Sequence, residues 1–404
     1  MPLIPITTEP RSSSYDVVII GGAIIGSSIA WFLSNYVDFN GSVLVVERDP
    51  LYEQCSTAHT NSCMRQQFSN PLNVQISQFA ADHVRNFQEH LGNDPEVPEI
   101  FVNHYGYMYL AGDDEFADTL RTNQAVQARL GAGTKIMTPD EITAAYPFYN
   151  VDDIICGSHN LIDEGYFDSG TMFDWWRRKA RQGGVEYTTN TVVGLERSGD
   201  KLTGVKLASG HQIVCGQVVN AAGPSATLIA DMAGVELKVE PRKRFTYIFD
   251  CAQDLGGNVP LTIDPSGVHV RSDGDAYMAG CTPRPDPAVA YDDYEMDRDI
   301  FEERVWPVLV HRIPAFERIK IQTQWAGHYA HNPFDHNVIV GPHNEVDNFF
   351  FANGFSGHGL QQSPAVGRGI AELIAYGEFR ELDMTALGYQ RIADNEPFVE
   401  TAII

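Results

Sequence analysis

The pattern of apolar runs and glycine-rich turns predicts a parallel α/β unit near the start of the chain. Residues 16–20 (DVVII) form a short apolar run that ends at two glycines, which is typical of a buried parallel strand. Residues 22–35 carry apolar side chains at helical spacing, and residues 43–46 (VLVV) form a second apolar run. This order of strand, helix and strand predicts the beginning of a doubly wound sheet.

The rest of the chain predicts a mixture of helices and strands without an internal repeat. Residues 242–282 alternate apolar and polar positions with frequent turns, which favours an antiparallel sheet. The other predicted elements are helices at 74–91, 171–182 and about 360–376, an aromatic-rich strand at 101–111, several strands between 185 and 219, and a buried strand at 349–352. Segments of nucleotide-binding type thus lie at both ends and in the middle, which predicts a nucleotide-binding domain interrupted by a substrate-binding lobe.

The charge balance argues against partners with anionic surfaces. The chain carries 53 acidic and 28 basic residues, for a net charge of −25, so nucleic acid and anionic membranes are disfavoured as ligands. An anionic substrate would need a local basic site. The apolar stretches are shorter than the ~20 residues of a membrane helix, and the first residues have no signal-peptide pattern. We therefore expect a soluble, cytoplasmic protein, a monomer or homo-oligomer, without membrane insertion.

The cysteines are scattered and do not form metal-binding pairs. The six lie at positions 55, 63, 156, 215, 251 and 281, and no CxxC spacing occurs among them. The sequence therefore predicts no zinc site, and the scatter favours a reducing compartment.

The first motif follows the first predicted strand and opens the first predicted helix. It consists of Gly21, Gly22, Ala23, Ile24, Ile25 and Gly26. A dinucleotide pyrophosphate needs backbone N–H donors and the positive end of a helix dipole, without side chains in the way. Glu47 ends the second strand, where a carboxylate accepts hydrogen bonds from ribose hydroxyls and repels a 2′-phosphate. FAD or NAD is therefore favoured over NADP.

Two further glycine-containing turns follow predicted strands. The first comprises Asn220, Ala221, Ala222, Gly223, Pro224 and Ser225, whose small side chains permit a close approach or form an ordinary strand-to-helix turn. The second is GFSGHGLQQSP (residues 354–364), which leads into the last helix. That helix start offers N–H donors that would stabilise negative charge on a reduced flavin. His358 could strengthen this effect or cap the loop.

These motifs resemble the D-amino-acid oxidase superfamily of FAD-dependent oxidoreductases, and within it the sarcosine oxidase branch. The resemblance runs from about residue 15 to the C-terminus. Four stretches are also similar to a mitochondrial group of FAD-dependent oxidoreductase domain proteins associated with assembly of respiratory complex I. They are MRQQFS (64–69), EPRKRFTY (240–247), WAGHYAHNPFDHN (325–337) and GFSGHGLQQSPAVGR (354–368).

The resemblance implies a fold of α/β and mixed-sheet α+β type. It implies a Rossmann-like FAD-binding domain of glutathione-reductase type (residues 15–97, 159–235 and 325–404). An antiparallel-sheet substrate domain (98–158 and 236–324) would be interleaved with it. Besides the first motif and Glu47, the cofactor residues that it implies are Arg48, Ser56, Thr57, His59, Asn61, Ser62, Met64, Val192, Val193, Ala221, Ala222, Gly223, Gly327, Gly354, Phe355, Ser356, Gly357, His358, Gly359, Leu360 and Gln361.

The resemblance also implies oxidation of the C–N bond of a small amine or amino acid by hydride transfer to flavin N5. Arg65 stands where sarcosine oxidases place a carboxylate-binding arginine, whose fork suits two parallel hydrogen bonds; the alternative is a surface or flavin-facing arginine. The other implied catalytic or substrate-facing residues are Tyr247, Arg271, His328 and His358, with His269 and Tyr329 as further candidates. Tyr247 could equally be a packed sheet aromatic.

Two departures from the branch change the expected chemistry. Gly327 stands where some sarcosine oxidases attach flavin through a cysteine, and Gln361 replaces a lysine that anchors the substrate carboxylate. A neutral amide cannot supply that charge, so sarcosine itself is disfavoured. Some dehydrogenase relatives attach flavin through a histidine near His59, but the loose match favours non-covalent FAD.

Three functions remain open from the sequence. The first is an amine or amino-acid oxidase or dehydrogenase, reoxidised by O2 or an electron carrier. The second is a 2-hydroxy-acid dehydrogenase on the same fold, and the third is a non-catalytic, FAD-bearing assembly protein.

Overall fold

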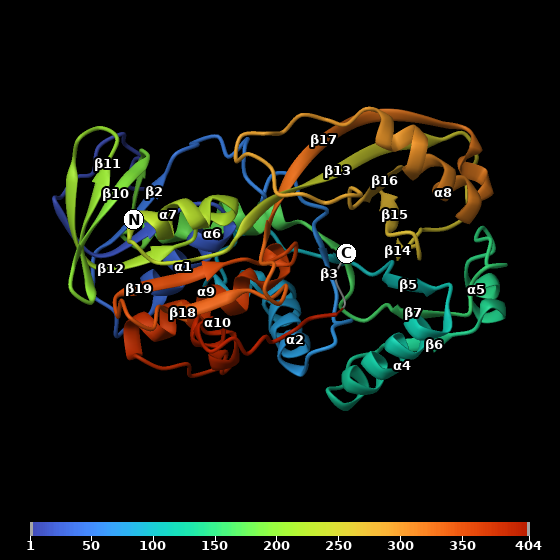
Figure 1. Cartoon of the computed structure of the whole chain (residues 1–404), viewed down its shortest axis with the longest axis horizontal. Coiled ribbons are helices and arrows are strands. Elements are labelled where there is room, and N and C mark those ends of the chain that lie inside the picture. Colours follow the sequence, from blue (N-terminus) through green and yellow to red (C-terminus); the bar gives the residue numbers. More distant parts are fainter. Residues whose placement is uncertain (1–2, 402–404) are drawn as a thin grey trace.

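Two large β-sheets form the framework of the protein. The structure is a computed structural model, and it describes residues 3–401. Each of the two sheets has eight strands, and a small three-stranded sheet accompanies them. Figure 1 shows the two large sheets at opposite ends of the molecule, with helix α2 (Pro71–Arg85) below the region between them. The predicted mixed α/β fold is confirmed.

The first sheet contains the predicted parallel unit. Its central strand β1 pairs in parallel with β2 on one side and β12 on the other, and β12 pairs in parallel with β19. The strands are β10 (Val192–Ser198), β11 (Lys201–Leu207), β12 (Gln212–Asn220), β1 (Ser14–Ile20), β2 (Val43–Glu47), β9 (Glu186–Thr189), β18 (Ile339–Pro342) and β19 (Phe349–Asn353). Parallel strands bring their carboxyl ends to one edge of the sheet, so the turns after β1, β2, β12 and β19 meet there.

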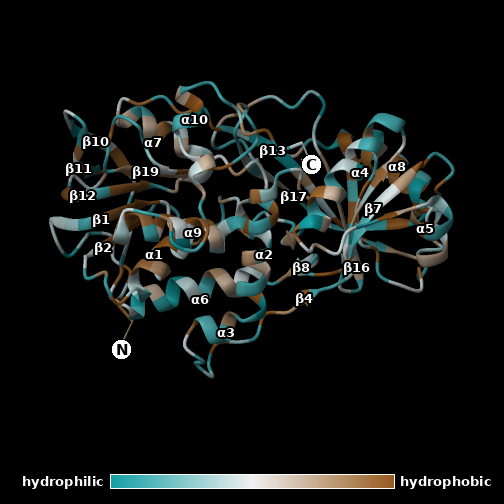
Figure 2. Ribbon diagram, turned by 90° about the horizontal axis from the view of Figure 1, so that it is seen from below, coloured by the Kyte–Doolittle hydropathy of each residue, from teal (hydrophilic) through white to brown (hydrophobic). Residues whose placement is uncertain are grey.

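The central strands are apolar throughout because both faces of the sheet are buried. Val17 and Ile19 of β1 pack with α1 (Ile24–Asn35) in one core, whereas Val18 and Ile20 pack into a second core on the other face. The first core includes the buried side of α6 (Ser169–Gln182) and of α9 (Gly359–Tyr376). Figure 2 shows hydrophobic and hydrophilic residues alternating along α6, as expected for a helix with one buried face.

The second sheet is mixed and mostly antiparallel. Its order is β17 (Ile319–His331), β13 (Glu240–Cys251), β16 (Ala276–Cys281), β15 (Val268–Asp273), β14 (Leu261–Ile263), β5 (Tyr107–Ala111), β7 (Cys156–Asn160) and β6 (Lys135–Met137). β14 and β5 pair in parallel and the other neighbours are antiparallel. The predicted antiparallel sheet over 242–282 is thus confirmed and gains strands from elsewhere in the chain.

The remaining elements surround these sheets. The small sheet has the order β3 (Cys63–Met64), β8 (Gly165–Phe167) and β4 (Val102–Asn103). The other helices are α3 (Phe87–His90), α4 (Asp114–Arg129), α5 (Pro139–Ala145), α7 (Ala226–Met232), α8 (Trp306–Arg312) and α10 (Gln390–Ala393). No helix within residues 3–401 combines the length and apolar character needed to cross a membrane.

Two predicted elements have different bounds in the structure. The helix predicted at 74–91 is divided at Asn86 into α2 and the short α3. The strand predicted at 101–111 is divided into β4 and β5 by a turn in which Gly106 has φ +85°. A left-handed backbone breaks an extended strand, and aromatic composition alone did not reveal it.

The predicted domain boundaries remain predictions, and two of them fall inside strands of the second sheet. Residue 325 falls inside β17, which pairs with β13 from Ile319 to His331 without leaving the second sheet. Likewise, β7 extends to Asn160, past the predicted boundary at 158.

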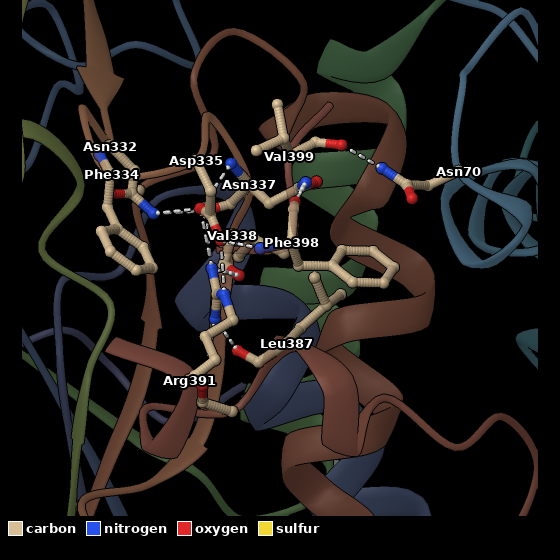
Figure 3. Close-up of polar contacts among 12 residues, drawn as sticks. Asn70, Asn332, Phe334, Asp335, Asn337, Val338, Leu387, Arg391, Phe398 and Val399 are labelled. Atoms are coloured by element: carbon tan, nitrogen blue, oxygen red, sulfur yellow. Dashed lines mark hydrogen bonds and ion pairs between the residues drawn. The ribbon is translucent and has the colours of Figure 1, made fainter. Parts of the chain in front are cut away.

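A buried ion pair ties the C-terminal segment to the body of the protein. Arg391 binds the fully buried Asp335 through Nε at 2.6 Å and Nη2 at 3.1 Å. The same carboxylate accepts a hydrogen bond from the backbone of Phe398 at 3.0 Å. Figure 3 shows these contacts and the neighbouring bond from Asn70 to the Val399 carbonyl. The segment therefore reaches the start of α2, which follows the Arg65 segment.

Candidate functional site

A cavity of about 620 Å³ is lined by residues from both large sheets. Most predicted cofactor residues lie on its wall: Gly21, Ala23, Ile24, Ile25, Glu47, Arg48, Ser56, Thr57, His59, Asn61, Ser62, Val192, Val193, Ala221, Ala222, Gly223, Gly327 and Phe355 to Gln361. The turns that follow β1, β2, β12 and β19 thus converge on one space, as parallel strand ends do. Gly22, Gly26, Met64 and Gly354 are not part of the wall, and their contacts with a cofactor stay predictions.

The glycines of the first motif shape the turn in different ways. Gly21 has φ +100°, and a Cβ there would lie 2.4 Å from the Ala221 carbonyl oxygen. A Cβ on Gly26 would lie 1.9 Å from the Gly21 carbonyl oxygen. Gly26 therefore allows α1 to approach the β1 turn closely without facing the cavity, as the predicted helix-on-strand packing requires.

The start of α1 and the end of β2 meet at this end of the cavity. Ala23 is the N-cap of α1 and offers no capping side chain, while Thr57 Oγ1 accepts from the Ile24 N–H at 3.3 Å. Glu47 accepts one bond per carboxylate oxygen, from the N–H of Gly22 and of Asp49, each at 2.8 Å. Burial raises the pKa of Glu47. The helix start and the carboxylate suit the pyrophosphate and ribose of a dinucleotide.

The start of α9 forms a second part of the wall. The preceding turn places Ser356 at φ +49° and Gly357 at φ +94°. A Cβ on Gly357 would lie 2.5 Å from the Tyr329 ring, so only glycine permits this contact. Gly354 packs against Asn332 and Val239 rather than facing the cavity. The cavity is therefore bordered by the N-termini of two helices, α1 and α9.

Arg65 lies on the cavity wall although its side chain is buried. Its exposed fraction is 2%, and its guanidinium lies 3.9 Å from the Phe68 ring centre. Nη2 donates to His358 Nε2 at 2.9 Å and Nη1 donates to the Gln67 carbonyl. The Arg65 backbone N–H donates to Gln361 Oε1 at 2.8 Å. Gln361 therefore supports the arginine segment, a contact that its place in the predicted motif did not reveal.

His358 is neutral and accepts the hydrogen bond from Arg65. Burial, followed by the charge of Arg65, holds the pKa of His358 well below its usual value. Since an arginine nitrogen only donates, His358 Nε2 must accept and Nδ1 must carry the ring proton. Of the two predicted roles, the geometry thus favours a structural one, because a neutral imidazole adds no full positive charge to the site.

Two predicted substrate-lobe residues do not reach the cavity. Tyr247 is fully buried in the core, with its ring 4.6 Å from that of Phe301. Arg271 points to the Asn61 carbonyl and to Asp273 instead. Adjacent residues on a strand face opposite sides, so the neighbouring Thr246 lies on the wall in place of Tyr247. His269, the other predicted candidate on β15, does line the cavity and lies 3.1 Å from Asn61 Nδ2.

His328 and Tyr329 both lie on the wall as predicted. The His328 ring stacks on Tyr294 with 4.2 Å between centroids, and its Nε2 donates to the Asp293 carbonyl at 2.7 Å. Ser56 Oγ donates to the His328 carbonyl at 2.6 Å. The Ser56 bond joins β17 to the loop after β2, and the other two contacts join β17 to the segment that holds Asp293 and Tyr294.

His59 occupies the space next to Gly327. A Cβ at position 327 would lie 2.7 Å from the His59 Cβ, so a cysteine there would clash with this histidine. His59 Nδ1 donates to the Cys55 carbonyl at 3.1 Å.

Comparison with known proteins identifies the family. The family model described as FAD dependent oxidoreductase matches residues 16–373. The chain belongs to this family. It is 38% identical to FAD-dependent oxidoreductase domain-containing protein 1 of Xenopus laevis, over 96% of this chain and 85% of that protein. It is 25% identical to human mitochondrial sarcosine dehydrogenase, over 95% of this chain and 42% of that protein.

A solved structure of similar fold supports the assignment. The crystal structure of L-proline dehydrogenase from P. horikoshii superposes with a TM-score of 0.83 at 28% identity, covering 98% of this chain and all of that one. The predicted resemblance to the D-amino-acid oxidase superfamily is therefore confirmed.

The cavity of this FAD-dependent oxidoreductase carries arginines on its wall although the chain is acidic. Its wall includes Arg48, Arg65 and Arg244, and within residues 3–401 the acidic side chains on it are Glu47 and Asp49. Arg244 binds Asp286 through both terminal nitrogens and stacks on the Tyr329 ring at 4.5 Å. The wall thus carries arginine side chains within a chain that is acidic as a whole.

An irregular segment, residues 282–298, contributes two wall residues that the sequence did not indicate. These are Tyr291 and Tyr294. The Tyr294 hydroxyl donates to the Gln54 carbonyl at 3.0 Å, beyond the end of β2. Lys243 of β13 binds Asp293 at 2.5 Å. The segment thus bridges the second sheet and the loop that borders the dinucleotide end of the cavity.

Replacing Tyr294 with phenylalanine should speed the dissociation of FAD. The change keeps the stacked ring and removes the bond to Gln54, a loss of about 0.5–1.5 kcal/mol, or roughly 2- to 12-fold in rate. Stopped-flow flavin fluorescence would measure it. Tyr277→Phe, in the core of the second sheet, is the matched control; equal rates in both variants would contradict the bridge.

Proposed function

We propose that this protein oxidises the C–N bond of a small amine or amino acid that carries a carboxylate. The supporting observation is the buried Arg65 on the wall of a cavity that is bordered by two helix N-termini. An arginine fork is suited to a carboxylate. Sarcosine dehydrogenase and L-proline dehydrogenase, by their names, act on such compounds.

FAD is the cofactor that the family uses, and we propose that it binds here without a covalent link. Backbone amides at the start of α1 would hold the pyrophosphate, Glu47 the adenosine ribose, and the α9 start would face the flavin. When bound, FAD supplies N5 as the hydride acceptor. Acid precipitation should release the flavin into the supernatant; flavin retained in the pellet would indicate a covalent bond, for example to His59.

The protein's own task would be to bind and orient the substrate. Arg65 would hold the carboxylate while the substrate loses a hydride from carbon and a proton from nitrogen, which gives an imine that water hydrolyses. We place the cofactor in residues 15–97, 159–235 and 325–404, and the substrate-facing wall in the second sheet. Either O2 or an electron carrier would reoxidise the cofactor, and the proposed location is the cytoplasm.

Anaerobic bleaching of the yellow protein tests the proposal. A panel of N-methyl amino acids, proline and D-amino acids is expected to reduce the flavin within minutes with at least one member. Bleaching by 2-hydroxy acids alone would make the protein a hydroxy-acid dehydrogenase. A protein that no member bleaches would fit the non-catalytic alternative.

A further inference from the structure

A buried carboxylate lies behind the Arg65 segment. Glu164, immediately before β8, is fully buried. Its Oε1 accepts from the Gln66 backbone N–H at 2.6 Å and from Asn160 Nδ2 at 2.8 Å. Its Oε2 accepts from Gln67 Nε2 at 2.8 Å. Both residues that follow Arg65 are thus held by one carboxylate.

The Glu164 contacts continue to the guanidinium. The carbonyl of Gln67 accepts from Arg65 Nη1, so the position of this peptide group fixes one side of the arginine fork. The Gln67 side chain is further bound by Ser158 Oγ at 2.7 Å and donates to the Tyr107 carbonyl at 3.0 Å. Glu164 therefore acts on Arg65 through the Gln66–Gln67 turn and does not contact the cavity itself.

All three partners of Glu164 are N–H donors, so the network favours an ionised carboxylate. A protonated carboxyl would bring an O–H among donors without an acceptor for it, which weakens its hold on the turn. We propose that Glu164 is a positioning residue whose ionised carboxylate holds the Gln66–Gln67 turn and thereby aims Arg65 at the substrate carboxylate. This inference rests on the proposed function of Arg65.

The protonation of Glu164 should change within the working pH range. Burial raises the pKa of Glu164 to about 7. The three hydrogen-bond donors and the charge of Arg65 lower this pKa and so limit the rise. The other titratable groups on the packed elements are Tyr107, Tyr109, His159, Asp163, His358 and Glu400. Burial lowers the pKa of both histidines and raises that of both tyrosines, so all four stay neutral between pH 6 and 8. Glu400 binds Ser69 and Asn70, farther along the Arg65 segment, and its charge also acts on Arg65.

Carboxylate binding to the FAD-loaded protein tests this role. Acetate and benzoate would be titrated from pH 6 to 8.5, with binding followed by the flavin absorbance. The wild type should bind them more weakly as the pH falls through 7. Glu164→Gln should bind about tenfold more weakly at pH 8, since one bond to the turn is lost, and should lack the change near pH 7. Glu400→Gln, which removes another buried carboxylate whose charge acts on Arg65, should retain that change.

A second variant and a second measurement apply if Glu164→Gln does not fold. Asn160→Ala removes one donor from the ionised carboxylate, so the midpoint of the pH effect should move to higher pH. The pH dependence of the free energy of unfolding provides an independent test of the raised pKa of Glu164. Because the pKa is higher in the folded state than its usual 4.5, this group's contribution to stability should fall as the pH rises from about 4.5 to 7. Urea denaturation should show this fall in the wild type, and in Asn160→Ala, whose Glu164 loses one donor, the fall should extend to higher pH.

The outcomes distinguish a failure of the role of Glu164 from a failure of the role of Arg65. Wild-type pH dependence in Glu164→Gln, or an unmoved midpoint in Asn160→Ala, would overturn the positioning role while leaving the proposed function intact. If the wild type binds neither carboxylate at any pH, the anchor role of Arg65 fails first, and the role of Glu164 fails with it.

Discussion

Replacing Arg65 with alanine should lower kcat/KM, for a substrate that reduces the flavin, on the order of 30- to 1,000-fold. This corresponds to a loss of about 2–4 kcal/mol of transition-state stabilisation. The guanidinium is buried beside Phe68 and lies on the cavity wall, so the substrate carboxylate would lose its cation in a site with little water. The loss should be largest for substrates with a carboxylate and small for amines without one. Steady-state kinetics with matched pairs of such substrates would measure the difference.

Two further variants distinguish binding from folding in this experiment. Arg65→Lys keeps the charge but loses the planar fork, so it should fall between the wild type and Arg65→Ala. Arg312 is equally buried and binds Asp153 and Asp264 away from the cavity. Arg312→Ala should therefore destabilise the fold while the folded fraction keeps its kcat/KM. Unchanged kinetics in Arg65→Ala would remove Arg65 from the substrate site.

The second large effect is expected at Gly26, where alanine should impair both folding and FAD binding. Its Cβ would lie 1.9 Å from the Gly21 carbonyl oxygen, so α1 must move away from the turn that would hold the pyrophosphate. Overpacking of this kind costs about 1–3 kcal/mol or more. Urea denaturation of the apoprotein and titration with FAD would report the two losses separately.

A glycine near the start of another helix provides the control for Gly26. Gly170, in the first turn of α6, has only the Asp168 carboxylate near the position of an added Cβ, at 3.4 Å. Gly170→Ala should be neutral or stabilising, because alanine favours helices over glycine by about 1 kcal/mol. If Gly26→Ala binds FAD as tightly as Gly170→Ala does, the close approach of α1 to the turn is not required for the cofactor.

The cofactor half of the site could be predicted because it is encoded locally. Gly21, Glu47 and the turn before α9 each lie next to a strand whose apolar sequence is recognisable, and parallel strands bring such turns together. The prediction of the substrate-facing residues depended on the register of single strands. Tyr247 and Thr246 are neighbours, and a shift of one residue decides which of them faces the cavity.

The sequence by itself determined the dinucleotide turn, the alternation of strands and helices, and the family resemblance, because each depends on spacing within a few dozen residues. Only the tertiary structure decided which distant groups support Arg65. Glu164 lies 98 positions from Gln66, and Gln361 lies 296 positions from Arg65. Tyr294 reaches Gln54 across 240 positions. Such contacts arise from how the sheets and loops pack, and a polar side chain satisfied by a distant backbone atom leaves no periodic signal along the chain.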